Sequence, residues 1–301
     1  MVHRHRLPFR STRLVALAAV VVLVAAGCSS DDATVADTAA PAPTTSSAPE
    51  PTAPSTLNVT ATDYAYAVDT EEVAAGLVTV NQDNQGAEAH QVTLVRLEDD
   101  QTVAEVVAGF QGPEGDHFVG NAAYAGGPTN TLPGEEATTT IELTEGTYGM
   151  FCFIASADGE SHFVKGMAGQ VEVVSGPEEP IEPPEVDATI RMSDFTYDVP
   201  ADFTGQGVVE VVNDGPQVHE LTIATPDLSA GSGLAAIAPG ATAYVPLDLR
   251  PGPYNFVCFV SDPDSGDPHF TLGMNIDVTV PGEGQLRSGR PPRPASAGRG
   301  Q

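Results

Sequence analysis

Two stretches of the sequence, CFIASADGESHFVKGM (residues 152–167) and CFVSDPDSGDPHFTLGM (residues 258–274), follow one pattern. Each begins with a cysteine, reaches a histidine after nine or ten intervening residues, and ends His-Phe-x-x-Gly-Met. A thiolate, an imidazole and a thioether are ligands that a soft, redox-active metal such as copper prefers. Because the order is kept twice, the sequence predicts two metal sites of the same kind.

A further histidine precedes each stretch, at the end of an Asn-x-Gly-x-x-x-His motif. The motif spans residues 84–90 in the first copy and 213–219 in the second. Its histidine completes a His-Cys-His-Met set in each copy. The eight candidate metal ligands are His90, Cys152, His162, Met167, His219, Cys258, His269 and Met274. The chain holds only three cysteines and seven histidines. Apart from Cys28, His3 and His5 near the start of the chain, the two sets use all of them except His117, which is expected to be a solvated loop residue.

The similarity between the copies extends beyond the ligands. Residues 63–66 (Asp-Tyr-Ala-Tyr) match residues 194–197 (Asp-Phe-Thr-Tyr), and a Pro-Gly pair lies nineteen residues before the cysteine in both copies. A register kept over this length indicates an internal repeat of one domain.

Short runs of alternating apolar and polar residues predict β-strands in both copies. They include residues 57–61, 139–143, 171–173 and 276–280. Such strands, punctuated by Gly and Pro, favour an all-β fold with one β-sandwich per copy and each cysteine pointing inward. The first copy has an insertion after His90, in which apolar residues between 103 and 110 at helical spacing predict one short helix.

At these motifs the chain resembles the cupredoxins, the family of plastocyanin, azurin and the blue-copper domains of larger copper enzymes. The resemblance covers both repeats and implies two tandem cupredoxin-like Greek-key β-sandwiches, each with one type 1 copper site, so up to two coppers in all. The interval between cysteine and loop histidine departs from plastocyanin and azurin, where only a few residues intervene. The longer interval here is closer to the blue-copper loop of nitrite reductases.

Composition divides the chain into six predicted segments. They are a lipoprotein signal peptide (1–28), a disordered Ser/Thr/Pro/Ala tether (29–56), cupredoxin-like domain 1 (57–174), a Pro/Glu linker (175–186), cupredoxin-like domain 2 (187–280) and a disordered basic tail (281–301). Cys28 ends an apolar run behind four arginines, as in a bacterial lipobox. We therefore expect lipidation at Cys28, export, and anchoring to the outer side of the bacterial cell membrane. The alternative is ordinary cleavage that leaves Cys28 without a role.

The charge balance restricts the partners. The chain has a formal net charge of −29 at pH 7. Between residues 57 and 280 its only Lys or Arg residues are Arg96, Lys165, Arg191 and Arg250. Such a surface repels nucleic acid and anionic lipid and attracts cationic partners or cations. High acidity can also serve solubility or adaptation to salt, and charge alone does not choose between these.

These features predict a cell-surface electron carrier that exchanges electrons with a redox partner protein, whose identity the sequence leaves open. Two alternatives are a lipoprotein that sequesters or delivers copper, and a cupredoxin-fold protein that binds no metal and mediates contacts. A Cys152–Cys258 disulfide is the structural alternative to metal binding. The chain is not expected to be an enzyme, because the copper enzymes it resembles need a second copper held by additional histidines, and its one His-x-His pair lies at residues 3–5.

Overall fold

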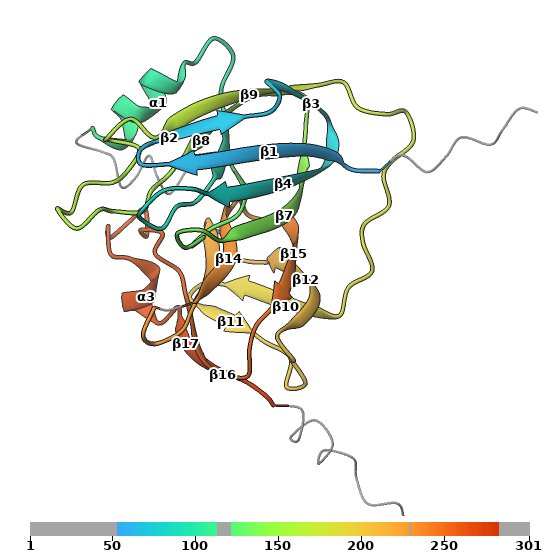
Figure 1. Cartoon of the computed structure of the whole chain (residues 1–301), viewed down its shortest axis with the longest axis vertical. Coiled ribbons are helices and arrows are strands. Elements are labelled where there is room, and N and C mark those ends of the chain that lie inside the picture. Colours follow the sequence, from blue (N-terminus) through green and yellow to red (C-terminus); the bar gives the residue numbers. More distant parts are fainter. Residues whose placement is uncertain (1–52, 113–121, 229, 283–301) are drawn as a thin grey trace, which may run out of the picture. The chain divides into compact units, whose positions relative to one another are not determined.

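The computed structural model of the chain describes residues 53–112, 122–228 and 230–282 (Figure 1). Nearly all of its regular elements are β-strands, which confirms the predicted all-β class. The predictions for the signal peptide, Cys28, His117 and most of the tether and tail lie outside the described residues. No helix among the described residues is long and apolar enough to cross a membrane.

The strands fall into two matching series. The first repeat contains β1 (Ser55–Thr62), β2 (Ala65–Val68), β3 (Glu72–Ala74), β4 (Gly76–Asn84), β5 (Thr93–Arg96), β6 (Tyr124–Gly126), β7 (Glu136–Leu143), β8 (Gly146–Phe151) and β9 (Ala168–Val174). The second contains β10 (Ala188–Ser193), β11 (Thr196–Asp198), β12 (Gln206–Asn213), β13 (His219–Ala224), β14 (Gly231–Ile237), β15 (Thr242–Asp248), β16 (Gly252–Val257) and β17 (Asn275–Val280). Two short helices, α1 (Val103–Phe110) and α3 (His269–Leu272), complete the regular elements of the described residues.

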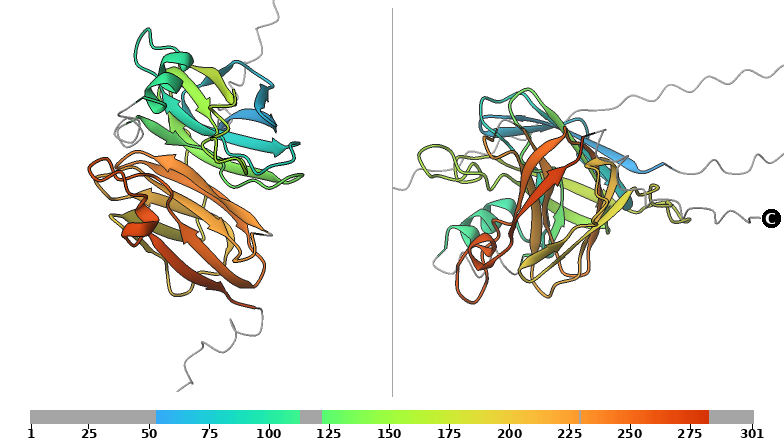
Figure 2. Two further views of the ribbon diagram at one scale, coloured as in Figure 1. Left: turned by 90° about the vertical axis from the view of Figure 1, so that its left-hand side faces the viewer. Right: turned by 90° about the horizontal axis from the view of Figure 1, so that it is seen from below.

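Each of the two sheets contains strands from both repeats, and Figure 2 shows their layering. One sheet has the order β11-β10-β12-β15-β7-β4-β1-β2, and the other has the order β17-β16-β13-β14-β6-β5-β8-β9-β3. The repeats meet where β7 pairs with β15 and β6 with β14, in both cases antiparallel. From these central pairs, equivalent strands run outward in matching order, so the repeat seen in the sequence is also a repeat of topology. The edge strand β3 of the first repeat has no counterpart among the strands described for the second.

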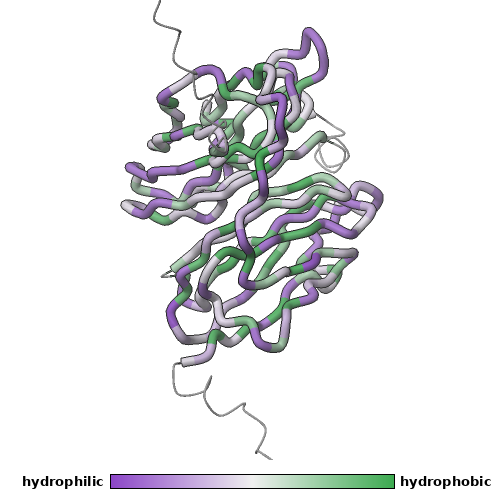
Figure 3. Tube along the Cα trace, turned by 90° about the vertical axis from the view of Figure 1, so that its right-hand side faces the viewer, coloured by the Kyte–Doolittle hydropathy of each residue, from purple (hydrophilic) through white to green (hydrophobic). Residues whose placement is uncertain are grey.

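The core follows the predicted alternation. Along β1, Leu57, Val59 and Ala61 are buried whereas their neighbours are more exposed, and the runs in β7, β9 and β17 also form strands. In Figure 3 hydrophobic stretches run along the strands, and many connecting loops are hydrophilic. Burial of these alternate side chains is the main favourable contribution to folding, at roughly 25 cal/mol per Å² of apolar surface.

The predicted helix of the first repeat is confirmed as α1. It begins with a capping box, in which Thr102 accepts the backbone N–H of Glu105 and the Glu105 carboxylate accepts that of Thr102. At its other end Phe110 packs edge-on against Phe151, with ring centroids 5.5 Å apart. The helix thereby contacts the last residue of β8, the strand that leads to Cys152.

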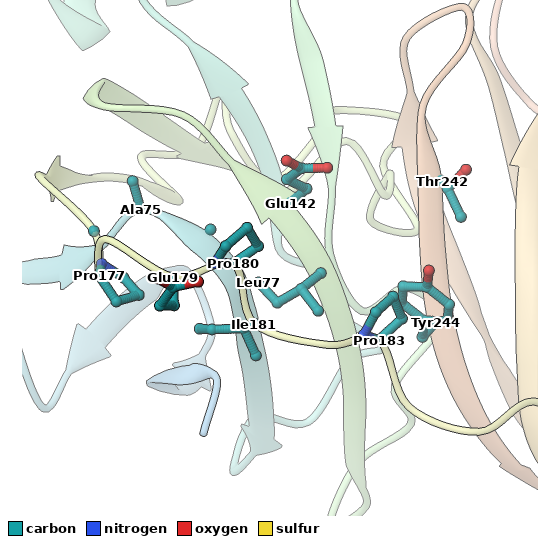
Figure 4. Close-up of a pocket in the computed structure, with 12 residues that line it drawn as sticks. Ala75, Leu77, Glu142, Pro177, Glu179, Pro180, Ile181, Pro183, Thr242 and Tyr244 are labelled. Carbon is teal, nitrogen blue, oxygen red and sulfur yellow. The ribbon is translucent and has the colours of Figure 1, made fainter. Parts of the chain in front are cut away.

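The linker between the repeats lines a pocket with residues from both sides (Figure 4). Pro180, Ile181 and Pro183 of the linker lie there with Leu77 of β4 and Tyr244 of β15. None of the twelve residues that line the pocket belongs to either ligand set.

Candidate metal centres

The structure brings the three predicted strong donors together in each repeat. In the first, Nδ1 of His90 lies 3.0 Å from Nδ1 of His162, and Cys152 Sγ lies 3.3 Å from His162 Nδ1 and 4.0 Å from His90 Nδ1. All three side chains are completely buried. His90 reaches the site from the segment just before β5, and the other two donors come from the loop between β8 and β9.

The second repeat builds the same group. His219 at the start of β13 and His269 at the start of α3 place their Nδ1 atoms 3.1 Å apart. Cys258 Sγ lies 3.5 Å from His269 Nδ1, and the three donor atoms lie within 4.8 Å of one another. These side chains are again completely buried.

The outer nitrogens of the first pair of histidines define their tautomers. Nε2 of His90 lies 2.7 Å from Asp63 Oδ1, and Nε2 of His162 lies 2.9 Å from Glu88 Oε2. Burial raises the pKa of Asp63, but hydrogen bonds from the Ala87 amide and His90 outweigh it and lower that pKa overall. An ionised carboxylate only accepts hydrogen bonds. Both imidazoles therefore carry their proton on Nε2, and both Nδ1 lone pairs are bare.

In the second repeat an amide replaces one carboxylate, and the same conclusion holds. His219 Nε2 lies 2.7 Å from Asp194 Oδ1, and His269 Nε2 lies 3.0 Å from Gln217 Oε1. Gln217 donates its Nε2 to the Asp262 carboxylate at 2.9 Å, which leaves its Oε1 to accept the proton of His269. Again both Nδ1 lone pairs face each other.

Two bare nitrogen lone pairs about 3 Å apart repel unless a cation lies between them. A proton would make one ring an imidazolium, yet burial lowers the pKa of His90 and His219, and burial also lowers the pKa of His269 to about 4. Two neutral imidazoles and a cysteine sulfur form the donor set of a trigonal copper site. The residues of both groups therefore fit copper.

The cysteines are poised for metal binding and not for a disulfide. Both are free and buried, so the alternative of a Cys152–Cys258 bridge is wrong. Burial raises the pKa of Cys152 to about 12 and that of Cys258 even further. Without a cation each is therefore a thiol at neutral pH, and a metal ion would stabilise the thiolate. A backbone N–H also points at sulfur, from Glu220 to Cys258 Sγ at 3.4 Å.

The two methionines are buried close to their cysteines. Met167 packs in one small cluster with Cys152 and Ala61. The amide of Cys152 donates to the Met167 carbonyl at 3.4 Å, and that of Cys258 to the Met274 carbonyl at 3.1 Å. Both methionine side chains are completely buried.

The Asn-x-Gly-x-x-x-His motif has a physical reason at each position. Asn213 is completely buried, donates to the carbonyls of Gln217 and Ile237, and accepts the Gly215 amide. A Cβ at Gly215 would lie 2.8 Å from Asp194 Oδ1 and 2.9 Å from His219 Nε2. Glycine is therefore required because the hydrogen bond between Asp194 and His219 passes directly over it.

The residues that accept the Nε2 protons of the imidazoles were not predicted from the sequence. Asp63 and Asp194 begin the repeated Asp-aromatic-x-Tyr segment. Glu88 and Gln217 lie two residues before His90 and His219, the histidines of the Asn-x-Gly-x-x-x-His motif, which we call the strand histidines because they lie just before β5 and at the start of β13. The signal for the aspartates was available, since the two tetrapeptides match. No alternation or spacing rule assigns them a role, because their partners are distant in sequence.

A buried carboxyl group distinguishes the second repeat. Glu220 directly follows His219 and accepts the backbone N–H of Phe259 at 2.8 Å. Burial raises its pKa to about 7, against 4.5 for an ordinary glutamate. In the first repeat Gln91 occupies the same position, and its amide side chain carries no charge.

The chain was compared with known proteins. No protein-family profile matches it, and no curated protein matches it. Among solved structures it is similar to auracyanin from Roseiflexus castenholzii, at 25% identity and a TM-score of 0.29, over 40% of this chain and 96% of that one. It is also similar to the blue copper protein auracyanin A from Chloroflexus aurantiacus, at 21% identity and a TM-score of 0.29, over 40% and 100%. A copper-containing nitrite reductase from Thermus scotoductus shares 12% identity at a TM-score of 0.21, over 74% and 60%.

The β-sandwich repeats and the two buried His-Cys-His groups confirm the predicted cupredoxin-like fold and the choice of copper. The expectation that the chain is not an enzyme is corrected. The similar structures include a nitrite reductase and copper oxidases, which are enzymes, as well as auracyanins. The lack of further His-x-His pairs within one chain therefore does not decide this question.

We predict that Gly215→Ala weakens the second site. The added methyl group must displace Asp194 or His219, so copper affinity at that site should fall by about tenfold, the usual cost of losing a partner behind a ligand. Metal titration of a variant that retains only this site measures the change. Gly282→Ala is the matched control, because its Cβ would meet Pro251 at an ordinary 3.9 Å. Equal affinities in the two variants would contradict the role given to Gly215.

We predict that Glu220→Gln stabilises the metal-free protein at alkaline pH. A folded-state pKa of about 7 against 4.5 means that folding penalises the ionised form, so this penalty is absent below pH 4.5 and complete above pH 7. Glutamine keeps the acceptor for Phe259 and removes the charge. The free energy of unfolding should rise by about 3 kcal/mol at pH 8 and stay nearly unchanged at pH 4.5. Denaturant titrations at both pH values test this, and a gain at acid pH alone would refute it.

Proposed function

We propose that this chain is a copper-binding electron carrier with up to two type 1 copper sites, one in each repeat. His90, Cys152, His162 and Met167 would hold the first copper. His219, Cys258, His269 and Met274 would hold the second. The observation that carries the proposal is the pair of bare Nδ1 atoms, 3.0 or 3.1 Å apart beside a buried sulfur, in both repeats.

The protein supplies what a one-electron carrier needs around its metal. Bound copper contributes the Cu(I)/Cu(II) couple. The buried donors exclude water, and the hydrogen bonds that Asp63 and Asp194 accept from His90 and His219 keep these imidazoles in a fixed tautomer and orientation. Because the donors belong to strands and tight loops of a packed sandwich, their positions can stay nearly the same in both oxidation states.

We also propose that the carrier is exported and anchored to the outer side of the bacterial cell membrane by a lipid on Cys28. The apolar run that ends at this cysteine and the polar segment that follows it support the proposal. The partner would be a redox protein and not nucleic acid, since the formal net charge of −29 repels polyanions.

Removing either thiolate should remove one share of the visible colour. Copper-loaded, oxidised protein is expected to absorb strongly through its copper–thiolate bonds. Cys152→Ser and Cys258→Ser should each lose about half of that absorption and one bound copper, because serine is nearly isosteric but supplies no thiolate. Visible spectra with metal analysis measure both. A protein that stays colourless in excess Cu(II) would refute the electron-carrier proposal.

The anchoring proposal is tested separately. Cys28→Ser should move the protein from the membrane fraction to the soluble exported fraction, because a lipid chain can no longer be attached. Its copper content and spectrum should not change. Fractionation with immunodetection measures the distribution, and a variant that stays membrane-bound would contradict lipidation at this residue.

A further inference from the structure

The two ligand sets differ at one matched position, two residues before the strand histidine. Glu88 occupies it in the first repeat and Gln217 in the second. Each accepts the Nε2 proton of the loop histidine, at 2.9 Å from His162 and 3.0 Å from His269. A carboxylate therefore faces one imidazole, and a neutral amide faces the other.

In the first repeat the negative charge lies one hydrogen bond away from the loop histidine. The Tyr64 hydroxyl donates to Glu88 Oε1 at 2.9 Å, and Ser156 Oγ donates to that hydroxyl at 3.0 Å. These contacts, the one from Tyr64 first and the one from His162 after them, lower the pKa of Glu88. Both oxygens of Glu88 thus accept hydrogen bonds, Oε1 from Tyr64 and Oε2 from His162, as the oxygens of a carboxylate do.

In the second repeat the charge lies two hydrogen bonds away. Gln217 stands between His269 and the buried Asp262, to which it donates at 2.9 Å. This bond is the main cause that lowers the pKa of Asp262 to about 2. Phe195 takes the place of Tyr64 and brings no hydroxyl group to the network. The amide thus separates the charge from the imidazole.

The partners of the strand histidines, His90 and His219, do not add to this difference in charge between the two sites. The strand histidines have the same partners at the same distance, 2.7 Å to Asp63 and 2.7 Å to Asp194. Gln91 and Glu220 differ, but they lie on the cysteine side. Comparing Glu88 with glutamine, and Gln217 with glutamate, inside one repeat at a time keeps that side constant.

From this geometry we infer that Glu88 acts through His162 as a positioning residue that lowers the reduction potential of the first copper site, and that Gln217 keeps the potential of the second site above the value a carboxylate would give. The inference rests on the proposed function. An ionised acceptor makes the imidazole a stronger donor and adds a negative charge nearby, and both effects favour Cu(II) over Cu(I). The Glu88 side chain is 35% exposed, so water and salt weaken its field, but the direct hydrogen bond persists.

Single-site backgrounds make the test specific. In Cys258→Ser protein, Glu88→Gln should raise the potential of the first site, equivalent to an approximately tenfold fall in the ratio of Cu(II) to Cu(I) affinity. In Cys152→Ser protein, the reciprocal Gln217→Glu should lower the potential of the second site. Redox titration followed at the copper–thiolate absorption measures both. Separate Cu(I) and Cu(II) competition titrations give the affinity ratio independently.

Glu160→Gln is the matched control, because Glu160 is an exposed carboxylate of the same loop, whereas the carboxylate that accepts the proton of His162 belongs to Glu88. It removes the same charge and should leave the potential nearly unchanged. Equal shifts in Glu88→Gln and Glu160→Gln, or an unchanged potential in Gln217→Glu, would overturn the inference. If Glu88→Gln fails to fold by circular dichroism, Gln217→Glu decides alone. Failure of the parent single-site proteins to take up copper would instead refute the proposed function.

Discussion

The rest of each metal centre depends on one constraint. Two neutral imidazoles face each other with their unprotonated Nδ1 atoms, and both rings are completely buried. Each ring must donate from Nε2, so an acceptor has to stand behind every histidine. Asp63 and Asp194 supply it for the strand histidines, and Glu88 and Gln217 for the loop histidines. The glycine of the repeated motif, the buried asparagine beside it and the register of the loop all serve to bring these acceptors into place.

The two repeats differ in how they cover the aromatic side chains next to Cys152 and Cys258. In the first, Phe110 of α1 lies 4.9 Å from Phe153 and 5.6 Å from Phe163 between ring centroids, and Phe163 is buried. The second repeat has a shorter segment between its strand histidine and Pro239, and Phe259 is 56% exposed. The insertion therefore covers the aromatic side chains beside the first ligand set. The second repeat lacks this cover, and Phe259 beside its ligand set is in contact with solvent.

Much of this could be predicted from the sequence, because the deciding features are local. Alternation predicts the strands of residues 57–61 and 139–143, helical spacing predicts α1, and the repeated motifs predict the histidines and cysteine that meet in each repeat. The outer partners could not be predicted, since the contact between Asp63 and His90 spans 27 residues and depends on tertiary structure. The pairing of β6 with β14 and of β7 with β15 was equally hidden, because alternation defines a strand's buried face but not its neighbour.

The acidic and amide side chains around the strand histidine are exchanged between the repeats. Glu88 precedes His90 and Gln91 follows it, whereas Gln217 precedes His219 and Glu220 follows it. Glu88 is partly exposed and has a lowered pKa, while Glu220 is buried and has a pKa raised to about 7. One repeat therefore places its charge on the histidine side, where it is stabilised by donors, and the other places a carboxyl group on the cysteine side, where burial opposes its ionisation. Two sites with the same metal ligands are in this way given different electrostatic surroundings by a pair of substitutions three residues apart.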